Sequence, residues 1–183
     1  MSGLRHSLMG LVLMASAGGS GALELNSPGL AEGARLGEKQ VFSGFGCEGL
    51  NVSPELVWSE VPAGTRSFAV TFYDPDAPTG SGWWHWTVFN IPASVRTLDE
   101  GAGAVGGSGL PKGAIQGRTD FGAAGFGGAC PPPGDSAHRY QMTVFALDIE
   151  LLPLDEQASG AMVGYMLNQH ALAKAHLNWT FGR

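Results

Sequence analysis

The sequence has little positive charge, few cysteines and no long apolar run. Its 183 residues include 10 lysines and arginines against 16 aspartates and glutamates, a formal net charge of −6, and the basic residues form no cluster. An acidic surface repels nucleic acid and anionic lipid, so we expect neither partner. The apolar stretch at residues 8–17 is too short to cross a bilayer, which takes roughly 20 residues, so we also expect no stable membrane insertion.

Several enzyme signatures are absent as well. The sequence contains no Gly-x-Ser-x-Gly elbow, no His-Glu-x-x-His and no Cys-x-x-Cys, which disfavours nucleophilic hydrolases and the common zinc sites. Residues 101–106 match Gly-x-Gly-x-x-Gly, but no buried strand precedes them and no helix follows, so a nucleotide loop is disfavoured. We predict a protein that is not an enzyme and needs no cofactor or metal.

The N-terminal residues are typical of a secretory leader. A weakly basic start at Arg5 and His6 precedes the apolar run, and small residues follow up to Ala22. We predict a signal peptide over residues 1–22 and a single domain over residues 23–183, in a periplasmic or secreted protein. A retained membrane anchor is the alternative interpretation.

The two cysteines, Cys47 and Cys130, both lie in glycine-rich stretches. An exported chain meets an oxidising compartment, so we expect a disulfide between them. Two independent buried thiols are the alternative, because cysteine is among the most buried residue types.

Glycine and proline, with 29 and 11 residues, are spread along the chain and favour many short elements joined by turns. Residues 67–73, 86–91 and 139–147 are rich in β-branched and aromatic residues on both alternating faces, which predicts central strands of a sandwich. Residues 176–181 alternate as a closing strand. The sequence therefore predicts a mainly β fold.

One segment has helical character. Ser159 can cap a helix over residues 159–175. Its predicted packing face carries side chains at helical spacing: Met162, Tyr165, Met166, Gln169 and Ala173. We interpret His170 in this helix as structural.

Two proline-rich segments carry the candidate site. Asp74 directly follows the predicted strand that ends at Tyr73. Two prolines restrict the conformation of the next loop, which contains Asp76. His85 begins the next strand between two tryptophans, and strict alternation would send its side chain to the face opposite both indoles.

The second segment runs from Pro131-Pro132-Pro133-Gly134 into His138-Arg139-Tyr140. A rigid loop again leads into a strand that opens with polar residues. Together the two segments could wall a small pocket that offers a carboxylate, two imidazoles and a guanidinium to a compact polar ligand.

These two segments resemble the signature regions of the phosphatidylethanolamine-binding proteins, also called the Raf kinase inhibitor protein family. The resemblance covers residues 25–181. Segments 79–86, 119–122 and 159–164 are similar to small bacterial members, and the cysteine contexts suggest the exported subset.

The resemblance implies an antiparallel β-sandwich of two sheets with a C-terminal helical element and an anion pocket at one end. Asp74, His85 and His138 match the family's pocket residues, and Pro132 and Tyr140 match positions on its rim and wall. The chain departs from several eukaryotic members, because residues 79–82 form a Thr-Gly-Ser-Gly turn where those members place a pocket tyrosine.

A small anion such as phosphate or a phosphorylethanolamine-like group would accept hydrogen bonds from His85 and His138, best when one imidazole is cationic. Asp74 would fix an imidazole tautomer or accept from an ammonium or hydroxyl group of the ligand. Trp83 is the further candidate for an aromatic surface, although we expect at least two of the tryptophans at positions 83, 84 and 86 to be core anchors.

We therefore predict a non-enzymatic binding protein that modulates a protein partner. An inhibitor of proteases or kinases is one alternative, suggested by some family members. A metal-dependent enzyme is another, because Asp74, His85 and His138 are also the inventory of a facial triad.

Overall fold

A computed structural model describes residues 22–183, so the predicted leader lies outside the described residues except for Ala22. In chain order the elements are β1 (Glu24–Asn26), the short 3-10 helix η1 (Glu38–Gln40), β2 (Ser43–Gly44), β3 (Cys47–Glu48), β4 (Leu56–Ser59), β5 (Ser67–Asp74), β6 (Trp83–Pro92), β7 (Thr97–Leu98), β8 (Ile115–Gln116), β9 (His138–Leu147), α1 (Gly160–His170) and β10 (Ala171–Phe181). The fold is mainly β, as predicted.

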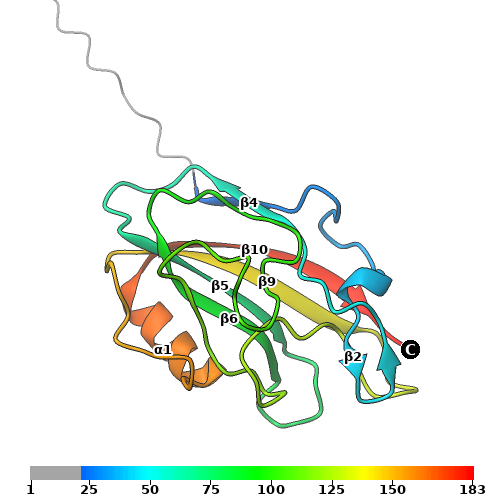
Figure 1. The fold of residues 1–183 in the computed structure, drawn as a ribbon. Coiled ribbons are helices and arrows are strands. Elements are labelled where there is room, and N and C mark those ends of the chain that lie inside the picture. Colours follow the sequence, from blue (N-terminus) through cyan, green and yellow to red (C-terminus); the bar gives the residue numbers. More distant parts are fainter. Residues whose placement is uncertain (1–21) are drawn as a thin grey trace, which may run out of the picture.

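The strands form two facing sheets and a small hairpin. The large sheet has the order β10-β9-β5-β6-β8, the smaller one has the order β1-β4-β7, and all their pairs are antiparallel. The main core lies between the sheets, where Trp58 of β4 meets Phe68 of β5 with ring centroids 5.4 Å apart. Figure 1 shows β4 on one side of the large sheet and α1 on the other.

The three predicted central strands are present. Their second faces are largely buried in β5, in β6 and in the second half of β9, whereas Gln141 and Thr143 in the first half of β9 are half-buried. Alternate residues of β5 face the main core, whereas Ala69 packs with Val163 and Leu167 of α1 in a second cluster. A strand buried on both faces reads as a continuous apolar run, which explains why the sequence located these strands well.

The helix prediction needs two corrections. α1 ends at His170 rather than at residue 175, because the chain pairs with β9 from Ala171 onward, and this tertiary pairing overrides helical propensity. The predicted packing face is also wrong, since Met162 and Tyr165 are 49% and 62% exposed.

The buried face of α1 carries Gly160, Val163 and Leu167 instead. A Cβ at Gly160 would overlap the Trp84 indole, so the absence of a side chain there lets the helix approach β6 closely. Ser159 caps the helix as predicted, with its Oγ accepting from the Met162 amide at 3.3 Å.

Candidate functional site

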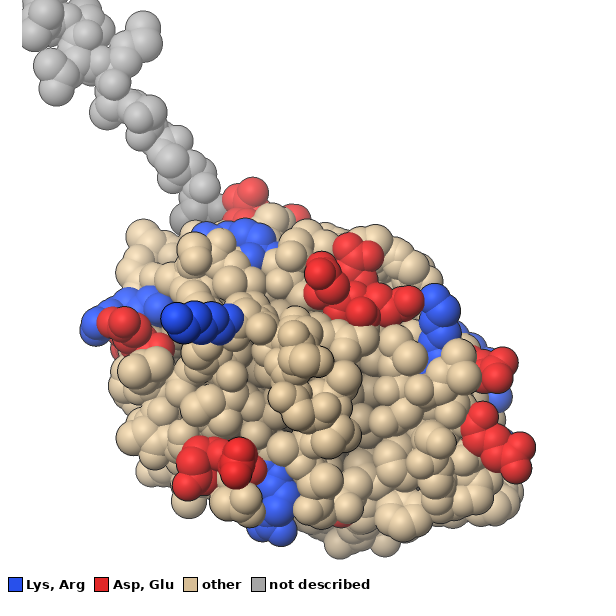
Figure 2. Space-filling model, viewed as in Figure 1, with Lys and Arg blue, Asp and Glu red and all other residues tan. Residues whose placement is uncertain are grey.

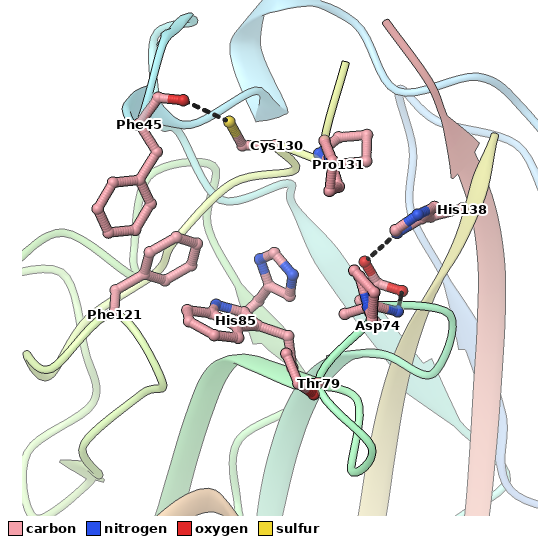
Figure 3. Close-up of a pocket in the computed structure, with 12 residues that line it drawn as sticks. Phe45, Asp74, Thr79, His85, Phe121, Cys130, Pro131 and His138 are labelled. Carbon is pink, nitrogen blue, oxygen red and sulfur yellow. Dashed lines mark hydrogen bonds and ion pairs between the residues drawn. The ribbon is translucent and has the colours of Figure 1, made fainter. Parts of the chain in front are cut away.

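The site lies at one edge of the large sheet, where three strand ends meet. β5 is antiparallel to both β6 and β9, so the end of β5 at Asp74 lies beside the start of β6 at Trp83 and near the start of β9 at His138. The loops at this edge enclose a cavity of about 200 Å³ (Figure 3). It is lined by Phe45, Asp74, Ala77, Pro78, Thr79, Trp83, His85, Phe121, Cys130, Pro131, Pro132 and His138.

Five of the eight predicted ligand residues line this cavity: Asp74, Trp83, His85, Pro132 and His138. Of the tryptophans at positions 83, 84 and 86, Trp83 reaches the cavity. Trp84 packs under α1, and Trp86 is fully buried in the core.

The other three predicted residues lie outside the cavity. Tyr140 is fully buried behind it, with its ring 5.3 Å from that of His85. Arg139 binds Asp76 through Nη2 to Oδ1 at 2.6 Å and Nε to Oδ2 at 2.9 Å. The hydrogen bond from the Arg139 side chain lowers the pKa of Asp76 to about 2, so the predicted guanidinium is engaged by a neighbour rather than offered to the cavity.

Asp74 is the best-anchored group of the site, at 2% exposure. Its Oδ1 accepts from the backbone amides of Asp76 at 2.8 Å and Ala77 at 3.1 Å, and its Oδ2 accepts from His138 Nδ1 at 2.8 Å. These bonds fix the carboxylate, the loop after β5 and the orientation of the His138 ring together.

His138 is a buried imidazole between two carboxylates. Nδ1 donates to Asp74, and Nε2 lies 3.4 Å from Asp135 Oδ2. Burial lowers the pKa of His138, but hydrogen bonds and charge from Asp74 and then Asp135 outweigh it, so the net pKa is raised. His138 therefore keeps its positive charge to higher pH than a free histidine.

His85 has the opposite electrostatic character. Its Nδ1 lies 2.9 Å from the carbonyl oxygen of Gly127 and 3.1 Å from that of Gly128, and since carbonyls only accept, Nδ1 carries the hydrogen. Burial lowers the pKa of His85 to about 4, against weaker opposing hydrogen bonds from these carbonyls. Near neutral pH the ring is uncharged, and Nε2, which makes no hydrogen bond with residues 22–183, is an acceptor.

The predicted direction of His85 is half wrong. The pairing of β5 with β6 passes from Phe72–Trp86 directly to Tyr73–Trp84, so His85 is the extra residue of a β-bulge. His85 consequently shares the inner face with Trp86, and its ring lies 5.4 Å from that of Phe72. A bulge re-aims a side chain in this way, whereas strict alternation would not.

The cavity has an aromatic side that the sequence reasoning missed. Phe45 and Phe121 lie on the side of His85 away from Asp74 and His138 (Figure 3), with ring centroids 5.7 Å apart. Phe45 stands at the tip of the β2-β3 hairpin with φ of +51°, a conformation unusual for a bulky residue. The disulfide between Cys47 and Cys130, present as predicted, was the available signal, because it ties this hairpin to the proline loop.

A second connection reinforces the disulfide. Arg183 donates from Nε to the Pro131 carbonyl and from Nη1 to the Gly46 carbonyl, both at 2.7 Å. The hairpin that carries Phe45 and the proline loop that walls the cavity are thus held together twice.

The cavity offers the positive charge of His138, whose Nε2 faces Asp135 at 3.4 Å, and acceptors at Asp74 and His85. An aromatic wall lies beside them, and no lysine or arginine lines the cavity. It suits a group that both accepts and donates hydrogen bonds. Within the described chain, no three histidine, cysteine or acidic side chains are grouped so as to hold a metal ion.

The family model for phosphatidylethanolamine-binding proteins matches residues 26–182. The chain therefore belongs to the phosphatidylethanolamine-binding protein family, whose members bind ligands. Among curated relatives, the UPF0098 protein YbcL of Escherichia coli K12 is 60% identical over 156 residues, 85% of each chain. The UPF0098 protein YbhB of the same organism is 54% identical over 159 residues, 87% of this chain and 99% of that protein.

Solved structures agree. The crystal structure of E. coli YbcL, described as a new member of the mammalian family, has a TM-score of 0.87 at 57% identity and covers 89% of this chain and 99% of that one. A homologue from Chlamydia trachomatis, CT736, has a TM-score of 0.72 at 29% identity and covers 88% of this chain and 98% of that one.

In residues 22–183, no helix combines the length and apolar character that crossing a membrane would require. On the face that Figure 2 draws, acidic and basic side chains are scattered among neutral residues, without a basic patch.

Proposed function

We propose that this protein binds a small phosphoryl or carboxylate ligand between His85 and His138 without transforming it. The observation that carries the proposal is the pairing of a cationic His138, held by Asp74, with a neutral His85 across one cavity. His138 supplies positive charge, and an anion would take the place of Asp135 at its Nε2. The free Nε2 of His85 accepts a hydrogen bond from a protonated oxygen of the ligand. A monoprotonated phosphate ester matches both groups, because it carries negative charge and an O–H donor.

Calorimetric titration with phosphorylethanolamine at pH 5.5 and 8 tests the proposal. We expect weaker binding at pH 8, because His138 loses charge as pH rises through its raised pKa. The phosphate ester itself loses its second proton near pH ~6. Ethanolamine O-sulfate separates the two effects, because its sulfate group carries one negative charge and its amine stays protonated across this range. The pH dependence of its binding therefore reports the protein alone.

Matched variants locate the effect. We expect His138→Gln to lower the affinity for phosphorylethanolamine at pH 5.5 by roughly tenfold. The variant should also lose the pH dependence of binding that is measured with the sulfate ester. His170→Gln is the control, because His170 pairs with Asp148 outside the cavity. Absent binding of both esters at both pH values, or equal affinity for His138→Gln, would overturn the proposal.

We further propose that the protein is exported and that ligand occupancy modulates a protein partner. The disulfide supports an oxidising compartment, and Phe45, 69% exposed at the cavity mouth, is a surface through which occupancy could be sensed. Mass spectrometry of the mature protein tests export, with a new N-terminus near residue 23 expected. Cross-linking with and without phosphorylethanolamine tests ligand-dependent partner contact.

A further inference from the structure

A second concave surface lies on the outer face of the large sheet, the face opposite the main core. It is a groove of about 310 Å³ beside the C-terminal half of α1. The pairing register sets its floor: Thr71 of β5 lies opposite Thr143 of β9, which lies opposite His176 of β10, while Gln141 lies opposite Tyr73. These positions are fixed by the same strands that build the core, so the groove is preformed.

The groove ends in an aromatic wall. The rings of Tyr73 and Trp84 have centroids 4.5 Å apart, and the Tyr73 hydroxyl donates to the Ser81 carbonyl at 2.8 Å. Trp84 is held from its other side by Gly160 and Gly164 of α1. Both rings therefore have fixed positions and give a ligand apolar surface at little entropic cost.

The polar groups of the groove are uncommitted. The side chains of Gln141, Thr143, Lys174 and His176 make no hydrogen bond with residues 22–183, and neither does Asn168 of α1. No aspartate or glutamate lines the groove. Lys174 forms no ion pair within the described chain, whereas Lys39, Arg66 and Arg139 each have a carboxylate partner. Lys174 therefore carries the formal charge among the residues that line the groove.

We propose that the groove binds an acidic sugar, a pyranose that carries a carboxylate. Amide and hydroxyl side chains both donate and accept, as sugar hydroxyls do, and a pyranose has an apolar C–H face that can pack on Tyr73. Lys174, with His176 beside it, binds the carboxylate of the sugar. This assignment stands apart from the anion cavity and does not rest on the function proposed for it.

The test is a two-dimensional amide NMR titration with methyl β-D-glucuronide. Methyl β-D-glucoside is the neutral match, and acetate supplies the carboxylate alone. We expect the glucuronide to shift amides of β5, β9 and β10 around Thr71, Thr143 and Lys174, with affinity at least roughly fivefold above that of either control compound. Amides at the cavity should not move.

Variants make the test specific. Lys174→Gln should lower the affinity for the glucuronide to that for the glucoside. Gln141→Ala should lower the affinity for both sugars. Lys112→Gln is the matched control, since Lys112 is also exposed and has no ion pair within residues 22–183. The proposal fails if the glucuronide leaves the groove amides unshifted, if it shifts the cavity amides instead, or if Lys174→Gln keeps the preference for the glucuronide.

Discussion

The cavity and the outer-sheet groove are built in opposite ways. In the cavity, Asp74 and His138 are almost fully buried and bound to each other. In the groove, Lys174 and His176 are exposed on a strand and have no such partner. Buried, mutually bound groups give precise geometry, but the fold then depends on them, whereas exposed groups on a rigid sheet can change without cost to the fold. Stability and binding should therefore be coupled in the cavity and separate in the groove.

The largest expected effect is that of Asp74→Ala. It would leave His138 Nδ1 and the backbone amides of Asp76 and Ala77 without their acceptor in a buried site. Breaking a buried pair in this way costs about 3–5 kcal/mol of unfolding free energy, measured by chemical denaturation. Asp148→Ala, which removes an exposed carboxylate from His170, is the control and should cost far less. A loss below about 1 kcal/mol would contradict the coupling of stability to the cavity.

Removing the disulfide comes next. The bridge closes a loop with a sequence separation of 83 residues, so Cys47→Ser with Cys130→Ser should cost up to about 4 kcal/mol through unfolded-state entropy. The hairpin that carries Phe45 should also loosen, which would weaken phosphorylethanolamine binding. The affinity of the same variant for methyl β-D-glucuronide should be unchanged. Equal losses of affinity at the cavity and the groove would contradict the contrast between the two sites.

The third effect is acid destabilisation by His85. Its pKa is about 4 in the folded protein, below the ordinary value of about 6.5. The unfolded state therefore takes up the proton first, and stability falls as pH drops from 6.5 to 4, by about 3 kcal/mol in total. His138 acts oppositely: because its folded pKa is raised, its contribution is complete below pH 6.5 and is lost as pH rises through that pKa.

Denaturation of His85→Gln at pH 7 and pH 4 measures the acid effect. The glutamine amide can still donate to the Gly127 carbonyl but does not titrate in this range. The difference in unfolding free energy between variant and wild type should narrow or reverse on acidification. An unchanged difference would mean that His85 is not held neutral by burial.

The sequence indicated a pocket shared by Asp74, His85 and His138, because each stands at the end of a predicted strand and all three match pocket residues of the family that the chain resembles. Antiparallel pairing of such strands brings these ends together. The bulge at His85 could not be predicted, because an extra residue is defined only against the partner strand. Phe45 and Phe121 were missed because loops that are distant in sequence become neighbours only through the disulfide and the folded sheet.

The prediction of the buried face of α1 was wrong for a related reason. Periodicity gave an apolar stripe through Met162 and Tyr165, yet the sheet selected the stripe with Gly160 because only a residue without a side chain fits against Trp84. A pattern reports which residues are apolar, but close approach to a partner decides which face is buried.

The smallest expected effect is that of Arg139→Gln, which sharpens where the cavity ends. Arg139 was a predicted ligand residue, but its guanidinium is 60% exposed and bound to Asp76 outside the cavity. Exposed ion pairs contribute little, so we expect an affinity for phosphorylethanolamine within about twofold of wild type. The same calorimetric titration measures it, with His138→Gln as the positive control. A loss near that of His138→Gln would show that the ligand extends past His138 to Arg139, and that the cavity, like the groove, draws on an exposed cation.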